Sequence, residues 1–206
     1  MRNIFWELFV LHGGTFAKPH EALAKLVNLM YAAAKSKGLQ PPVSKLTMGM
    51  IRVSGKPPKL KLKAAEGRHM LPITVIILEW FMPPPPTTHE QLRLDCAQAL
   101  NNVYKEMEPI IWVSSESPKV VRNYAVKHLL LYVELNKETR ARCRKGTFWR
   151  LYPKHHLFHH VIFDTWDNPR EDWCYGDEAS IGICAQMCTK LHASTLQTQL
   201  LERHRL

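Results

Sequence analysis

The sequence has few acidic residues, no long apolar run and no glycine-rich phosphate loop. The last two shortages each exclude a class of protein. Asp and Glu number 18 against 28 Lys and Arg, so the formal net charge is +10. The most apolar stretch, Leu71–Met82, is interrupted by Glu79 and is far shorter than the roughly 20 residues that span a bilayer. Gly13 and Gly14 lack the lysine of a nucleotide-binding loop. We therefore expect neither a membrane span nor a P-loop.

The cysteines do not form the dense pattern of a disulfide-rich protein. The five cysteines, an odd number, are spread from Cys96 to Cys188, which does not suit a dense disulfide framework. The apolar run Ile4–Leu11 is short, contains Glu7 and has no small-residue cleavage site, so it does not predict a secretory signal. These observations favour a reduced, cytoplasmic or nuclear protein.

What the chain has in excess is positive charge, which attracts phosphate backbones. One cluster lies between Lys45 and Arg68, and a second between Lys137 and Lys154. Positive side chains at a helix C-terminus also complement the helix dipole, and a basic surface can simply be solvated. We expect DNA contact, with these candidate residues: Lys59, Lys61, Lys63, Arg140, Arg142, Arg144, Lys145, Arg150 and Lys154.

Hydrophobic periodicity predicts a mainly α protein, a single multi-helix domain. Thr87 and Glu90 form a capping-box pattern, and Gly38 is a helix stop. Residues 1–55 read as an N-terminal helix and loop region, and 56–206 as a helical C-terminal region. The expected helices are His20–Lys37, Lys59–Met82 with a kink near Pro72, Thr87–Glu108, Ser117–Arg142, one beginning near Pro153, and Glu178–Leu191.

A histidine-rich segment follows Pro153, a residue that suits the first turn of a helix. On such a helix His155 and His159 share one face, and His156 and His160 share the adjacent face. Two imidazoles at that spacing can bind one transition metal, and we take His155 and His159 as the candidate ligands. The alternative is structural, with one pair hydrogen-bonded in the core and the other in solvent.

The last candidate groups are Asp177 and Glu178. Gly176 precedes them, and Asp177 is a good N-cap for a helix, which explains it structurally. An ionised carboxylate at a helix start could equally hold a divalent cation for phosphoryl transfer. Cys184, Cys188 and His192 cannot join in one zinc site, because eight helical residues rise about 12 Å.

The order of motifs in the last third resembles the C-terminal part of transposase-like proteins of eukaryotic mobile elements, which have an RNase H-like core with three acids. The segments that carry this resemblance are Trp149–Phe158 with His160, Asn168–Arg170, Trp173–Tyr175, Asp177–Glu178 and Ile181–Gly182, with weaker likeness over Lys59–Pro72 and Thr195–Leu206.

The resemblance implies that Glu178 stands at the last catalytic acid, beside Asp177, and that the metal is Mg²⁺ or Mn²⁺. This sequence departs from the family because no Asp occurs before Asp95 and no run of strands is evident. We expect a tail of such a protein that lacks the first catalytic strands, the helical C-terminal part of an RNase H-like core.

Three functions remain open. The preferred one is a DNA-contacting fragment without activity by itself, which works as a homo-oligomer or with the remainder of a larger transposase. The second is a metal-dependent nuclease using His155, His159, Asp177 and Glu178. The third is a helical protein-interaction module.

Overall fold

The computed structural model describes residues 4, 7–8, 19–41, 43, 46–51, 60–62, 64–82, 84–108, 116–142, 148–164 and 168–169. Within these ranges the chain forms helices and no β-strand, which confirms the expected mainly α class and its multi-helix architecture. The helices are α2 (Pro19–Ser36), α3 (Met48–Ile51), α4 (Ala64–Trp80), α5 (Thr88–Glu106), α6 (Glu116–Arg142) and α7 (Pro153–Phe163). The link to an RNase H-like core stays a prediction.

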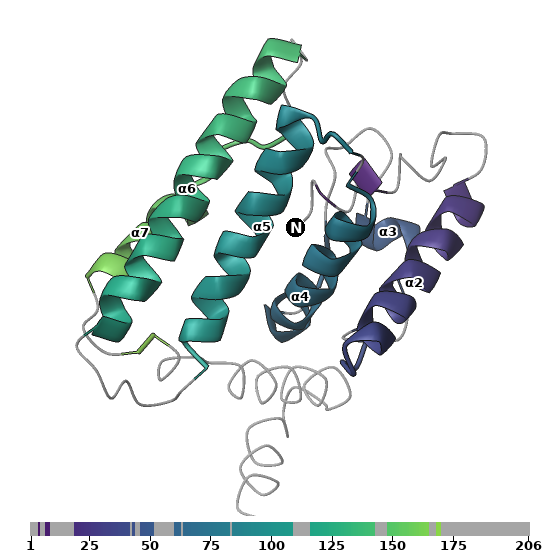
Figure 1. Ribbon diagram of the computed structural model, residues 1–206, viewed down its shortest axis with the longest axis horizontal. Helices are drawn as coiled ribbons and strands as arrows, with labels where there is room; N and C mark the ends of the chain where they lie inside the picture. The colour runs from purple at the N-terminus through teal and green to yellow at the C-terminus, as the bar shows by residue number, and fades with distance from the viewer. Residues whose placement is uncertain are drawn as a thin grey trace, which may run out of the picture. The chain divides into compact units, whose positions relative to one another are not determined.

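Helix α4 is the buried centre of the structure. Eight of the nine residues from Met70 to Leu78 are buried, and Pro72 is the exception. A helix that is apolar on all sides needs neighbours on all sides, and α4 lies between α2 and α5 (Figure 1). The single hydroxyl in this run, that of Thr74, donates to the carbonyl of Met70 at 2.8 Å, so no polar hydrogen is buried without a partner there.

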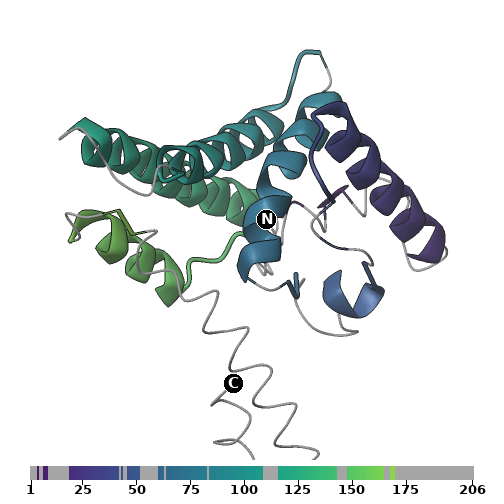
Figure 2. The same cartoon turned by 90° about the horizontal axis from the view of Figure 1, so that it is seen from below.

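The remaining helices extend this layer in the order α4, α5, α6 and α7. The most extensive helix packing is between α5 and α6, where Ala97 of α5 and Ala125 of α6 are both buried. Leu135 of α6 is fully buried too, and burial of a leucine side chain contributes about 1.5–3 kcal/mol. Helix α7 then lies along α6 (Figure 2).

Two helix boundaries follow the predicted capping chemistry. Thr87 and Glu90 form the expected capping box, in which the Thr87 N–H donates to the Glu90 carboxylate at 2.9 Å. At the end of α2, Gly38 adopts a positive φ of 63°, and the Leu39 N–H donates to the carbonyl of Ala34 at 2.9 Å. That bond across the turn requires a left-handed residue, which glycine provides. Both predictions are confirmed.

The helix predicted over Lys59–Met82 starts later than expected. Residues 60–62 are not helical, and α4 begins at Ala64. Leu60 and Leu62 pack against the core while Lys61 is exposed, so the alternating pattern of an extended segment prevails here. The Lys61 N–H donates to the carbonyl of Met50 at 2.9 Å. This bond joins the segment to α3, a short helix inside what the sequence indicated to be a loop.

All described residues belong to one compact unit, Met1–Arg170, and the unit Glu171–Leu206 lies outside the described ranges. Helix α2, which precedes the boundary expected at residue 55, packs against α4, which follows it. Among the described helices none is both long enough and apolar enough to cross a membrane.

Candidate nucleic-acid interface

Helix α7 is held antiparallel on α6 by aromatic and guanidinium contacts. The ring of His155, in the first turn of α7, lies 4.3 Å from the ring of Tyr132. Further along, Phe158 packs edge-on against His128, with ring centroids 6.0 Å apart. At the far end the Arg122 guanidinium donates to the carbonyl oxygens of Ile162 and Phe163. A cation at the carbonyl end of a helix complements its dipole, so Arg122 acts as an external C-cap of α7.

The segment that leads into α7 is fixed by its backbone. Trp149 is buried and adopts a positive φ of 51°, which is rare for a large side chain. The Asn136 side-chain amide donates to the carbonyl of Trp149 at 2.7 Å, and the Tyr132 hydroxyl donates to the carbonyl of Arg150 at 3.2 Å. These bonds from α6 hold the chain so that the Arg150 side chain is exposed.

A group of charged side chains, which the sequence did not indicate, anchors Trp149 from the other side. We call it the Glu7 network. The Glu7 carboxylate accepts bonds from Arg93 at 2.8 Å and from the Trp149 indole N–H at 2.9 Å. His89 lies between Glu7 and Glu138, with its Nε2 3.2 Å from one carboxylate and its Nδ1 2.6 Å from the other. Both ring nitrogens face acceptors, so His89 satisfies both only as an imidazolium.

The geometry of the network shifts the pKa values of Glu7 and His89 in opposite directions. Burial by itself would raise the pKa of Glu7, but the His89 hydrogen bond and the Arg93 charge together lower it. Burial would likewise lower the pKa of His89, but its bonds to Glu7 and Glu138 raise it above the usual value of 6.5. Each charge therefore stabilises the other.

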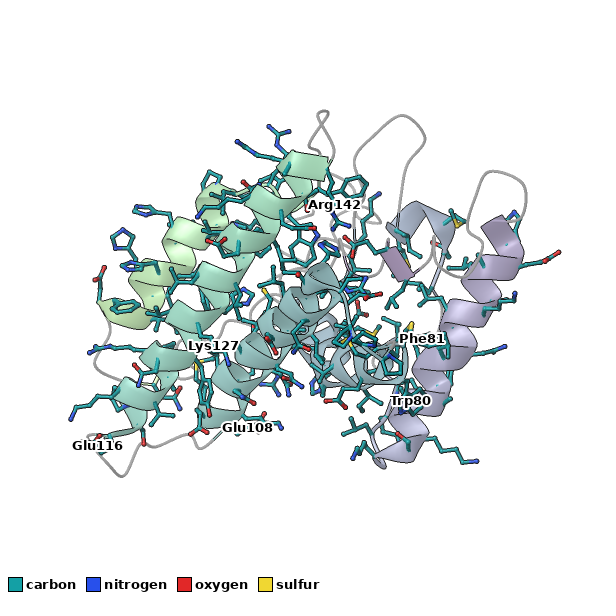
Figure 3. All side chains as sticks on the ribbon, turned by 45° about the horizontal axis from the view of Figure 1, so that its top comes forward. Trp80, Phe81, Glu108, Glu116, Lys127 and Arg142 are labelled. Carbon is teal, nitrogen blue, oxygen red and sulfur yellow. The ribbon has the colours of Figure 1, made fainter. Side chains whose placement is uncertain are left out.

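The predicted phosphate-binding residues fall into three groups. Arg140, Arg142, Arg150 and Lys154 are exposed, and we call these four the α6–α7 cationic residues. Arg142 lies at the end of α6 opposite Glu116 (Figure 3). Lys61 is exposed beside α3, on a different part of the chain. The other four candidates, Lys59, Lys63, Arg144 and Lys145, lie outside the described residues.

The cations of α6 and α7 differ in whether an acid neutralises them. Lys119 and Lys137 each pair with a glutamate three residues earlier, at 2.7 Å. Arg142 pairs with Glu138, which also contacts His89. Arg140, Arg150 and Lys154 have no acidic partner within the described part of the chain. Over residues 116–142 and 148–164 there are eight Lys and Arg against four acids, so this side of the bundle carries an excess of positive charge.

The histidines of α7 are placed differently from each other. The Nδ1 of His155 accepts the N–H of Tyr152 at 3.0 Å, so that lone pair is already used. His159 stacks on Phe163, with ring centroids 4.4 Å apart. His156 and His160 instead meet through their Nε2 atoms at 2.9 Å. The contact therefore joins His156 to His160 and not His155 to His159. Metal binding by His155 and His159 stays a prediction.

Of the four residues of the nuclease hypothesis, His155 and His159 are described, and Asp177 and Glu178 lie outside the described residues. Within the described ranges no group of three or more His, Cys, Asp and Glu is arranged to hold a metal ion. The asparagine of one segment that carries the resemblance, Asn168–Arg170, has a structural role. The side-chain amide of Asn168 is buried and donates to the carbonyl of Met107, the C-cap of α5, at 3.1 Å.

A cysteine–histidine pair between α5 and α6, in which Cys96 is buried and His128 is partly buried, can be compared with a nucleophilic dyad. The Cys96 sulfur lies 3.3 Å from the Nδ1 of His128, and that nitrogen lies 2.9 Å from the carbonyl of Cys96. Burial raises the pKa of Cys96 to about 12 and lowers the pKa of His128 to about 4. A reactive thiolate needs a lowered pKa, so both groups stay neutral and the pair is structural.

Comparison of the chain with family models, with curated proteins and with solved structures finds no match. The functional argument therefore depends on the side chains of α6, α7 and the segment between them.

Proposed function

We propose that this protein binds nucleic-acid phosphates through the α6–α7 cationic residues, as a fragment related to transposase-like proteins that does not cut nucleic acid by itself. The observation that carries the proposal is the exposure of Arg140, Arg150 and Lys154 without an acidic partner in the described ranges. Phosphate contacts supply most of the sequence-independent affinity of nucleic-acid-binding proteins. An exposed cation without an intramolecular partner keeps its hydrogen-bond donors available for them.

Helix capping explains only part of this charge. Arg140 and Arg142 lie in the last turn of α6, where positive charge is favourable. Arg150 follows the helix and has no such role. Lys154 lies in the first turn of α7, which contains no acidic residue, and there a positive charge opposes the dipole. The cation of Lys154 does not serve helix stability, which supports a function outside the fold.

The anchoring of the segment before α7 supports the same proposal. Binding by a mobile side chain costs conformational entropy, and the backbone at Arg150 is already fixed by Tyr132 and by the neighbouring Trp149. Only the side chain of Arg150 then has to be ordered when a phosphate binds. The motif order from Trp149 to His160, which resembles transposase-like proteins, covers this segment, and membership of that family is part of the proposal.

The test is a salt series of fluorescence-anisotropy titrations with a short labelled DNA duplex. The variant carries Arg140→Gln, Arg150→Gln and Lys154→Gln. The matched control carries Lys25→Gln, Lys35→Gln and Lys119→Gln, which removes the same charge from exposed positions elsewhere. Each lost phosphate contact reduces the magnitude of the slope of log K against log salt by about 0.9. The slope of the Arg140, Arg150 and Lys154 variant should therefore be smaller in magnitude than the wild-type slope by about 2–3, and the slope of the control should change much less.

Three results would contradict the proposal. The first is a wild-type affinity that does not change with salt. The second is an equal loss of affinity in the two triple variants, which would reduce the effect to overall charge. The third is a slope unchanged in the Arg140, Arg150 and Lys154 variant. Far-UV circular dichroism checks that all three proteins keep their helix content.

A further inference from the structure

The exposed histidine pair on α7 has the geometry of two adjacent metal ligands. His156 and His160 are four residues apart on the helix, their Nε2 atoms are 2.9 Å apart, and their rings are almost perpendicular at 88°. An imidazole nitrogen binds a transition metal at about 2.0–2.1 Å, so two such bonds at 90° put the nitrogens about 2.9 Å apart. The two Nε2 atoms therefore lie at a separation that suits neighbouring positions around one ion.

A carboxylate orients one of the two rings. The Nδ1 of His160 lies 2.5 Å from the carboxylate of Asp164, the C-cap residue of α7. Nδ1 must carry the proton of that bond, which leaves Nε2 of His160 with its lone pair. Metal-binding histidines usually have such a partner on the second nitrogen, which fixes the tautomer and raises the basicity of the ligand. Asp164 faces the far side of the ring and is not itself a ligand.

The geometry points to a binding site for a late first-row divalent ion, Ni²⁺ or Cu²⁺, formed by His156 and His160 with Asp164 as the orienting group. In the metal-free protein the contact is a hydrogen bond, in which the Nε2–H of His156 donates to Nε2 of His160. Binding moves that proton to the exposed Nδ1 of His156, and no net proton is released. Water fills the remaining positions, because both rings are exposed.

The ion class follows from ligand type and angle. Imidazole nitrogens suit Ni²⁺ and Cu²⁺, and adjacent ligands at 90° are typical of their tetragonal sites. Mg²⁺ prefers oxygen ligands, so it should not bind here. The ion proposed here thus differs from the Mg²⁺ or Mn²⁺ expected at Glu178, and its binding does not depend on nucleic-acid binding.

The first test is isothermal titration of Ni²⁺ into the full chain, prepared without a polyhistidine tag. Removal of one ligand of a linked pair turns chelation into single-site binding, so His156→Ala and His160→Ala should each lower the association constant about a hundredfold. Asp164→Ala should lower it about tenfold. His20→Ala is the matched control, since His20 is an exposed histidine on α2, and it should change the constant less than about threefold.

The second test locates the ion. Substoichiometric Cu²⁺ should broaden the amide signals of α7 in a ¹H–¹⁵N spectrum before others, and His160→Ala should abolish that selectivity. The inference is overturned if α7 signals are not broadened first, if His20→Ala weakens Ni²⁺ binding as much as His160→Ala, or if neither His156→Ala nor His160→Ala weakens it. Because both ligands are exposed, their replacement should leave the helix content unchanged.

Discussion

Trp149 donates its indole N–H to the carboxylate of Glu7 at 2.9 Å, although 142 positions separate the two residues in the chain. The same carboxylate is bonded to Arg93 and His89 of α5, and His89 connects onward to Glu138 of α6. One glutamate thereby ties the start of the chain to α5, to α6 and to the segment that holds Arg150. This relationship couples the stability of the bundle to the geometry of its cationic residues.

Replacement of Glu7 by Gln should destabilise the fold by about 2–4 kcal/mol, because the buried Arg93 guanidinium would lose its carboxylate partner and His89 would keep only Glu138. Urea unfolding measures the change. Glu134→Gln is the control: it removes an exposed pair with Lys137 and should cost less than about 1 kcal/mol. An equal effect of the two substitutions would mean that the Glu7 network contributes no more than a surface ion pair.

Stability should fall at alkaline pH through His89. Because its folded pKa is raised above 6.5, its contribution is complete below that value and is lost as the pH rises through the folded pKa. Unfolding free energies from about pH 6 to about pH 9 should therefore decline in the wild type and decline less in His89→Gln. Parallel pH profiles of the two proteins would show that His89 is not charged in the folded state.

Acid should weaken the bundle through His128, in the opposite direction. Its folded pKa is lowered to about 4 from 6.5, so its neutral form is favoured by folding, and that stability is lost as the pH falls from 6.5 toward 4. One pKa unit corresponds to about 1.4 kcal/mol, which predicts a loss of about 3 kcal/mol over this range. His128→Gln should reduce the slope of stability against pH. A slope as steep as that of the wild type would assign the acid loss to other groups.

Core packing gives a prediction independent of charge. Ile77 of α4 is fully buried, and Ile77→Ala should cost about 2–5 kcal/mol through lost burial and a cavity. Leu130 of α6 is 61% exposed, so Leu130→Ala should change stability by less than about 0.5 kcal/mol. Thermal unfolding of the two variants compares them directly. A large loss at Leu130 would indicate that a partner covers this face of α6.

Local chemistry was predictable from the sequence, and long-range polar contacts were not. Thr87 with Glu90, Gly38 and Pro153 each give a signal within a few residues, and each helix boundary follows it. The extended stretch at 60–62 was misjudged because Ala64 to Glu66 favour a helix that starts only after it.

The Glu7 network had no sequence signal. Glu7 and Trp149 lie in unrelated stretches, and a single glutamate in an apolar run reads as an interruption of it. The packing of α5 against α6 brings His89 to Glu138, and Glu7 joins this pair to Trp149 from outside both helices.

The choice between the two histidine pairs of α7 was ambiguous for a different reason. Helix periodicity relates His155 to His159 and His156 to His160 equally. The aromatic neighbours Tyr132 and Phe163 engage the first pair and leave the second free to meet.

The burial of α4 on all sides also determines how the chain can be divided. Its cover comes from α2, which precedes it, and from α5, which follows it. A fragment of residues 56–206 would contain α4 but not α2. The side of α4 that packs against α2 would then face water. Such a fragment should aggregate or recruit a substitute helix, so the smallest unit that can be expressed in soluble form includes Pro19–Ser36.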